Sequence, residues 1–136
     1  LITGDTAASD FVFKMNDYMV SHFSEEGETC SPSTESAGVV TAVYVEGMTK
    51  AYTVAKTLGD EERADCYARF IRNGAETVME LQFPMEDLNL DDYPEEAIPI
   101  ATGGFCGSKT DVTMQVDRNQ HETMALMRAY ELGLIE

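Results

Sequence analysis

The stretch that decides the fold is VYVEGMTKAYTVAKTLGDEERADCYARFIRNGAETVMELQ, residues 43–82. Apolar and small side chains recur in it every three or four residues, a spacing typical of amphipathic helices. The spacing predicts one helix over 39–58, which Gly59 can end in the left-handed conformation. A second helix is predicted from Asp60, whose side chain can cap it, to about Gln82, before Phe83-Pro84. Because the turn at Gly59 is so short, we expect an antiparallel hairpin.

Each helix of this hairpin has one apolar stripe. The first stripe consists of Val40, Tyr44, Gly47, Met48, Ala51, Ala55 and Leu58. The second consists of Ala64, Tyr67, Ala68, Ile71, Ala75, Val78, Met79 and Gln82. Since Gly47 and Ala51 are small, we expect a neighbouring helix to approach closely there.

Two more helices are predicted outside the hairpin. One covers 9–23, where a stripe recurs at helical spacing: Phe11, Met15, Tyr18, Met19 and His22. The other runs over 117–132 and ends at Gly133. Between the hairpin and this last helix lies a long irregular loop, 84–115, of a length that favours a functional role. Apart from one candidate short strand pair near 113–116, no alternation predicts β-structure, so we expect a single, mainly α domain over 1–136.

The chain is strongly acidic, with 25 acidic and 9 basic residues and a formal net charge of −16. This charge argues against nucleic acid and anionic membranes as partners, because both are bound through Lys and Arg. It suits a solvated acidic surface, as in extracellular or cation-binding proteins. No apolar stretch approaches the ~18 residues of a membrane-spanning helix. The chain begins at Leu1 rather than Met, which suggests a removed leader or a piece of a longer polypeptide.

The three cysteines are Cys30, Cys66 and Cys106, and none forms a C-x-x-C pair. A zinc ribbon or thioredoxin-like site is therefore not expected. The odd number leaves at least one thiol without a partner in the chain. Cys30 and Cys106 both lie in predicted loops and are one candidate bridge, but the spacing does not fix the connectivity. The redox compartment stays open, with an extracellular location favoured over a cytoplasmic one.

The hairpin carries a recognisable set of residues: Tyr44-Val45-Glu46-Gly47-Met48, Ala51-Tyr52, Ala55, Gly59-Asp60, Tyr67 and Leu81-Gln82. This set resembles the pattern Y-x-E-G…AY…A…GD…Y…LQ of carbohydrate-active α/α-toroids, which include six-hairpin glycosidases and sugar epimerases. The segment 103–121 is similar to their crossing from an outer to an inner helix. The resemblance implies helical hairpins arranged around a central cavity. Since 136 residues supply about two of six hairpins, it also implies self-association or contact with further hairpins of a longer chain.

The resemblance implies a site at one rim of such a cavity. If helices 39–58 and 117–132 are the inner pair, they run the same way, and Glu46, Asp117 and His121 approach one another. Two carboxylates can then serve as general acid and base, and His121 can move a proton near neutral pH. Tyr44 is a candidate platform for stacking on a sugar. Alternatively, Glu46 and Asp117 cap helices and His121 is a hydrogen-bonded core residue.

Further candidates for substrate contacts are Gln120, Gly104 and Phe105. The glycine pair before Phe105 can bring amide groups close to an anion, or it can form a tight turn that packs Phe105 inward. The acidic surroundings favour the turn. The chain has no Trp, which weakens the carbohydrate interpretation, although its six Tyr residues can replace it.

No cofactor and no metal are predicted for this site. The run Asp87-Leu88-Asn89-Leu90-Asp91-Asp92 superficially resembles a calcium loop. It has Asp92 where an EF-hand needs Gly, and Ile98 where it needs Glu, so an EF-hand is excluded. A looser calcium site at Asp87, Asn89 and Asp91 stays open. A G-x-S-x-G nucleophile elbow is absent from the sequence.

The sequence therefore supports two hypotheses. The first is a carbohydrate-active or carbohydrate-binding domain with acid and base residues on two inner helices. The alternative is a non-catalytic acidic surface or assembly protein built from helical hairpins, which stack when they cannot bury their faces alone. Whether the chain is an enzyme is left open by the sequence.

Overall fold

The computed structural model describes residues 6–24, 30–32 and 39–136. The elements in these ranges are α1 (Thr6–Phe23), α2 (Val39–Leu58), α3 (Glu61–Met79), a 3-10 turn η1 (Leu90–Asp92), α4 (Ile98–Ala101) and α5 (Val116–Glu131). The described residues form isolated bridges but no β-strand, so the mainly α class is confirmed and no strand pair forms at 113–116. Among the described helices, none combines the length and the apolar character needed to span a membrane.

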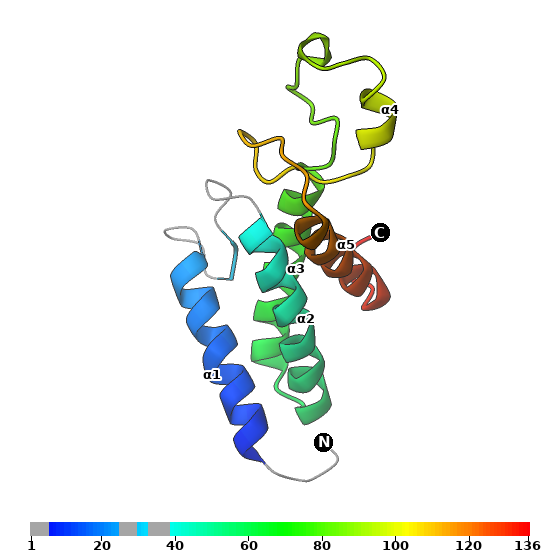
Figure 1. Ribbon diagram of the computed structural model, residues 1–136. Coiled ribbons are helices and arrows are strands. Elements are labelled where there is room, and N and C mark those ends of the chain that lie inside the picture. The colour runs from blue at the N-terminus through cyan, green and yellow to red at the C-terminus, as the bar shows by residue number, and fades with distance from the viewer. Residues whose placement is uncertain (1–5, 25–29, 33–38) are drawn as a thin grey trace.

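The predicted hairpin is confirmed by α2 and α3, which run antiparallel and pack side by side (Figure 1). Gly59 ends α2 with φ +73°, the left-handed conformation that glycine adopts easily. The Asp60 side chain accepts a hydrogen bond from the Arg63 backbone amide at 3.1 Å and so caps α3. The expected boundaries of α2 are confirmed, whereas α3 ends at Met79, three residues earlier than expected.

The hairpin packs closely because small side chains line it, but the close approach is not at Gly47. Gly47 is exposed, and a Cβ atom there would meet nothing within 4 Å. Gly74 on α3 is buried instead, and a Cβ atom there would collide with the Val45 side chain. The core around this contact contains Ala42, Val45, Met48, Ala51, Ala55, Ala64, Tyr67, Ala68, Phe70, Ile71, Ala75 and Val78.

The predicted inward face of α1 is wrong apart from Met19, which is partly buried and packs against the core. Phe11, Met15 and Tyr18 are 65%, 47% and 55% exposed. The buried residues of α1 are Ser9, Phe13, Asn16 and Val20. The polar members of this face donate hydrogen bonds within their own helix, the Ser9 hydroxyl to the Thr6 carbonyl and the Asn16 amide nitrogen to the Val12 carbonyl. The Asn16 Oδ1 atom has no hydrogen-bond partner among the described residues. Hydrophobicity alone therefore indicated the wrong side.

A charged cluster attaches α1 to α3. Asp17 accepts hydrogen bonds from the Arg63 guanidinium at 3.1 Å and from the Tyr67 hydroxyl at 2.6 Å. The Arg63 guanidinium also lies over the Phe13 ring, 4.5 Å from its centroid. Tyr67 is fully buried, and burial together with Asp17 raises the pKa of its phenol. The hydroxyl thus stays protonated and donates to Asp17.

The disulfide differs from the candidate that the loops suggested. Cys30 bonds to Cys66 of α3, and Cys106 is a buried free thiol, so a Cys30–Cys106 bridge is not formed. Cys66 lies on α3 rather than in a loop, and its side chain is only partly buried, so Cys30 can reach it. The bridge ties the chain that follows α1 to α3.

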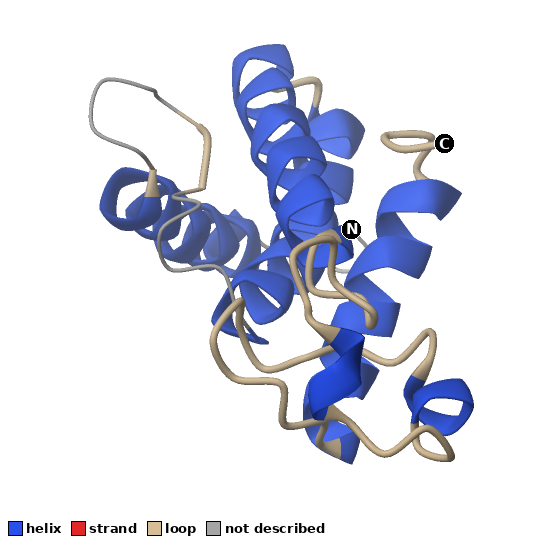
Figure 2. Cartoon of the chain, turned by 90° about the horizontal axis from the view of Figure 1, so that it is seen from above, coloured by secondary structure: helices blue, strands red, loops and turns tan. Residues whose placement is uncertain are grey.

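On the other side of the hairpin, α5 packs mainly against α2 and also against α3 (Figures 1 and 2). It covers Val116–Glu131, one residue earlier at each end than expected, and Gly133 follows with φ +66°. Both α2 and α5 begin at the end of the molecule that carries residues 84–115 (Figure 1). These residues form an irregular connection with η1 and α4 inside it. The helices that carry the predicted site therefore do run the same way.

Candidate functional site

The structure brings together two predicted site residues that are 75 positions apart. The Glu46 Oε2 atom lies 2.9 Å from the His121 Nδ1 atom. An ionised carboxylate can only accept, so Nδ1 carries the hydrogen and Nε2 is left for another partner. The two side chains are 31% and 37% exposed, so a ligand can reach them. The site is a carboxylate–imidazole pair at the contact between α2 and α5.

Asp117 and Gln120 lie beside this pair on the first turns of α5. Asp117 is four positions before His121, so both side chains lie on one face of the helix, with Cβ atoms roughly 6 Å apart. Asp117 and Gln120 are exposed, and the Asp117 carboxylate has no hydrogen-bond or ion-pair partner among the described residues. The helix cap is Gln115, without a side-chain bond, so Asp117 is not the capping residue of α5.

Tyr44 does not belong to this site. Its ring packs on Phe23, at the end of α1, with the ring centroids 4.4 Å apart. Tyr44 and Glu46 are two positions apart on one helix, a rotation of about 200°, so they point to nearly opposite sides. Glu46 faces α5 and Tyr44 faces α1. The expectation that Tyr44 forms a stacking platform over the pair is therefore wrong.

Gly104 and Phe105 have structural roles. Phe105 is buried in the core at 5% exposure. A Cβ atom at Gly104 would press on Met114, Ala101 and Asn119, so glycine is needed for close packing. The Asn119 side chain bonds both the amide and the carbonyl of Phe105, at 2.8 and 3.1 Å. These contacts fix the turn on α5 and correct the expectation that the two residues bind substrate.

The amides of this turn are all occupied by protein carbonyl or carboxamide oxygens. Gly103 donates to Phe83, Gly104 to Ala101, Phe105 to Asn119 and Cys106 to Leu81, at 2.8–3.0 Å. The segment after α3 and the turn thus lie against each other, which explains why α3 ends before Gln82. No amide of 103–106 is left to hold an anion, so the turn interpretation of the glycine pair is the one that fits.

The sequence reasoning missed Glu122, the residue next to His121. Glu122 has no exposed surface, and neither carboxyl oxygen has a hydrogen-bond partner among the described residues. Burial raises the pKa of this carboxyl to about 7, against the opposing charges of Arg118 and His121. A signal existed, since Glu122 shares the buried face of α5 with Ala125 and Ala129 at helical spacing.

Cys106 of the connecting loop lies near Glu122. Cys106 is fully buried, and burial, followed by the charges of Glu122 and Asp111, raises the pKa of its thiol. Arg118 donates to the Asp111 carboxylate at 3.0 Å, and its guanidinium fills the space where a side chain at Gly107 would stand. The end of α5 that carries the pair is therefore also the place where the loop is attached.

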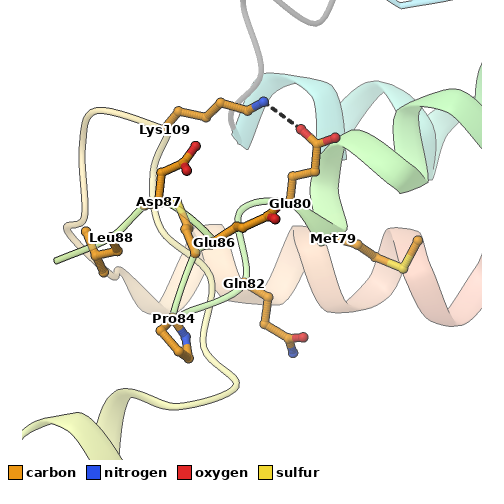
Figure 3. A pocket seen from close by; sticks show the side chains of 9 residues that line it. Met79, Glu80, Gln82, Pro84, Glu86, Asp87, Leu88 and Lys109 are labelled. Carbon is orange, nitrogen blue, oxygen red and sulfur yellow. Dashed lines mark ion pairs between the residues drawn. The ribbon is translucent and has the colours of Figure 1, made fainter. Parts of the chain in front are cut away.

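A pocket of about 440 Å³ lies elsewhere, between the end of α3 and the loop (Figure 3). Its lining is Met79, Glu80, Gln82, Pro84, Met85, Glu86, Asp87, Leu88 and Lys109, which includes none of the predicted site residues. Lys109 is paired with Glu80 at 2.6 Å. The partly exposed Glu46–His121 pair thus lies outside this pocket.

The run that resembled a calcium loop forms the turn η1. The Asn89 side chain caps this turn by accepting from the Asp91 amide at 3.3 Å. Among the described residues, no three His, Cys, Asp or Glu side chains are grouped so that they can hold a metal ion. Comparison of the chain with protein-family models, with curated proteins and with solved structures finds no significant match.

Proposed function

We propose that this domain binds or acts on a carbohydrate at the Glu46–His121 pair, as one part of an α/α-toroid-like arrangement in which α2 and α5 are inner helices. The observation that carries the proposal is the 2.9 Å contact between these two side chains from distant parts of the chain. Because both helices begin at the same end of the molecule, we expect the pair and Asp117 to lie at one rim of the toroid cavity.

The pair has the chemistry of a positioned base. Glu46 accepts the hydrogen on Nδ1 and so orients the imidazole of His121. Nε2 can then accept a proton from a sugar hydroxyl or from a carbon next to a carbonyl group. Asp117, one helical turn away, is the second carboxylate and can hydrogen-bond a neighbouring hydroxyl. Since the chain has a net charge of −16, neutral sugars are expected to bind better than uronic acids.

The chain has two histidines, which makes a direct experiment available. The imidazole NMR signals of His121 and His22 are followed while neutral oligosaccharides and oligouronates are added. We expect the His121 signals to shift and those of His22 to stay, because His22 lies on α1 and stacks on Tyr18. If no sugar of either class moves the His121 signals, the proposal is wrong.

Variants sharpen this experiment. His121→Gln and Glu46→Gln are expected to weaken sugar binding about tenfold or more, since the first removes the imidazole and the second removes the negative charge that orients it. His22→Gln is the matched control and should bind as the wild type does. Equal loss of binding in all three variants would contradict the assignment of the site.

A second candidate, assembly through α1, is favoured by one observation. Phe11, Met15 and Tyr18 form an exposed stripe along this outer helix. A second copy of the chain covering this stripe would bury it. Light scattering over a wide concentration range should then show a dimer that Phe11→Ser with Tyr18→Ser dissociates, whereas the exposed Val43→Ser on α2 does not. A monomer at all concentrations would eliminate this candidate.

A further inference from the structure

Glu122 is a carboxyl group placed where its charge has no bonded partner. It is completely buried, and both oxygens lack hydrogen-bond partners among the described residues. An ionised carboxylate in such a place is strongly disfavoured, so the group is stable there as the neutral acid. Ionisation therefore requires a cation to approach it or the surrounding packing to open.

The titratable and charged groups around Glu122 come from three elements. On α5 itself they are Arg118 and His121. From α2, Glu46 is bonded to His121 and holds that imidazole. From the loop come the Cys106 thiol and Asp111, which accepts a hydrogen bond from Arg118. Arg118 is thus the cation that is free to exchange one carboxylate for another.

Arg118 lies four positions before Glu122, so the two side chains are on the same face of α5. We propose that Arg118 is a switch: it holds the loop through Asp111 while Glu122 is protonated, and it turns to Glu122 when that carboxyl ionises. The exchange breaks the bond from Arg118 to Asp111 and withdraws the guanidinium from Gly107. The loop turn around Gly107 then loses the Arg118 contact that ties it to α5, while Phe105 stays bonded to Asn119.

The two carboxyl groups differ in a way that supports this exchange. Hydrogen bonds from Thr113 and Arg118 lower the pKa of Asp111 to about 2, so its charge is constant over the neutral range. Burial raises the pKa of Glu122 to about 7. Of these two carboxyl groups, only Glu122 changes its charge near neutrality, and it therefore decides which partner Arg118 takes.

Release of the loop should be visible at its backbone and at Cys106. The turn is closed by bonds between Ser108 and Asp111, and the Thr113 amide donates to the Asp111 carboxylate at 3.0 Å. Cys106 is buried beneath it as a free thiol. Loosening should speed amide exchange in 106–113 and expose the thiol to an alkylating reagent, without unfolding the hairpin.

The experiment is hydrogen exchange of 106–113 as the pH rises through about 7, corrected for the intrinsic pH dependence of exchange. In the wild type, protection of this segment should fall at least tenfold across the transition. In Glu122→Gln it should stay high throughout, and in Asp111→Asn it should be low throughout. A fall in Glu122→Gln as large as in the wild type would overturn the proposal.

A control and a second readout keep the test decisive. Glu131→Gln is the matched control, because Glu131 also pairs with an arginine of α5, at 2.6 Å from Arg128, and it should not change the loop. The carbon NMR signal of the Glu122 carboxyl, observed in the wild type, should titrate together with the rate of Cys106 alkylation, once this rate is corrected for the ionisation of the thiol. If this carboxyl titrates at its ordinary 4.5, or if the alkylation rate does not follow it, the switch does not exist.

Discussion

The two sides of the α2–α3 hairpin hold carboxyl groups in opposite states. On the α1 side, Asp17 is bonded to both Arg63 and Tyr67, and a disulfide joins Cys30 to Cys66. On the α5 side, the buried carboxyl of Glu122 has no partner among the described residues. The first arrangement stabilises the fold. The buried carboxyl of Glu122 lowers the stability of the fold when it ionises. A group without a partner can therefore respond to a change of pH or to a ligand.

The largest effect is expected from breaking the α1 attachment at its disulfide. The bridge closes a loop with a sequence separation of 36, for which chain entropy gives about 4 kcal/mol of stabilisation. Replacing Cys30 and Cys66 together by Ser should lower the free energy of unfolding by about 3–4 kcal/mol in urea titrations. A reducing agent should have the same effect on the wild type and none on the variant. Unchanged stability on reduction would show that the bridge does not support α1.

The next effect tests the α5 side through the pH dependence of stability. Glu122 keeps its proton in the folded chain up to a pKa of about 7, whereas the unfolded chain loses it near 4.5. Between these values the unfolded state binds fewer protons, so this group makes the wild type less stable as the pH rises. The total loss is up to about 3 kcal/mol, since each pKa unit corresponds to about 1.4 kcal/mol.

Glu122→Gln removes this titration. The variant should therefore gain stability relative to the wild type from pH 4.5 to about 7, and the difference should be constant above that range. Urea unfolding of both proteins at several pH values measures it. The exposed Glu131→Gln provides the control curve. A flat difference between Glu122→Gln and the wild type would mean that the buried carboxyl does not hold its proton.

The sequence predicted the hairpin well because the signals that define it are local. Gly59 and Asp60 are neighbours, and each acts on the backbone within a few residues. The meeting of Glu46 and His121 was also predictable, since it follows from the direction of two helices joined through this hairpin. Such inferences need helix limits and chain direction but no detailed packing.

The features that escaped prediction depend on which side chains satisfy one another. Asn16 and Ser9 face inward although they are polar, and each donates a hydrogen bond to a carbonyl of its own helix, so apolar spacing misled on α1. Tyr44 seemed to be near Glu46 because they are close in sequence, but helix rotation separates them. Glu122 was overlooked because a charged residue is rarely expected on a buried face. Only the three-dimensional contacts decide these three cases.

A smaller effect on stability is expected from replacing Asp17. This replacement tests a carboxylate that has hydrogen-bond partners, in contrast to Glu122, which has none among the described residues. Asp17→Ala leaves the buried Tyr67 hydroxyl without its acceptor, which should cost about 1–2 kcal/mol. The ion pair with Arg63 adds little, because both side chains are more than a third exposed and are screened by solvent. The exposed Asp10→Ala on α1 is the control and should be within about 0.5 kcal/mol of the wild type. Combining Asp17→Ala with Tyr67→Phe should show strong coupling, and independent effects would contradict the contact.

The smallest effect on stability is expected at the Glu46–His121 pair. We expect this pair to serve in sugar binding and not to hold the helices together. Both side chains are about one third exposed, so their contact should contribute less than about 1 kcal/mol to folding. Glu46→Gln and His121→Gln should unfold at nearly the same urea concentration as the wild type while they lose sugar binding. Asp17→Ala should do the reverse, with lower stability and intact binding, because Asp17 bonds to Arg63 and Tyr67 rather than to the pair. A large loss of stability in His121→Gln would mean that this pair belongs with Asp17 among the groups that hold the helices together, and the contrast between the two sides of the hairpin would fail.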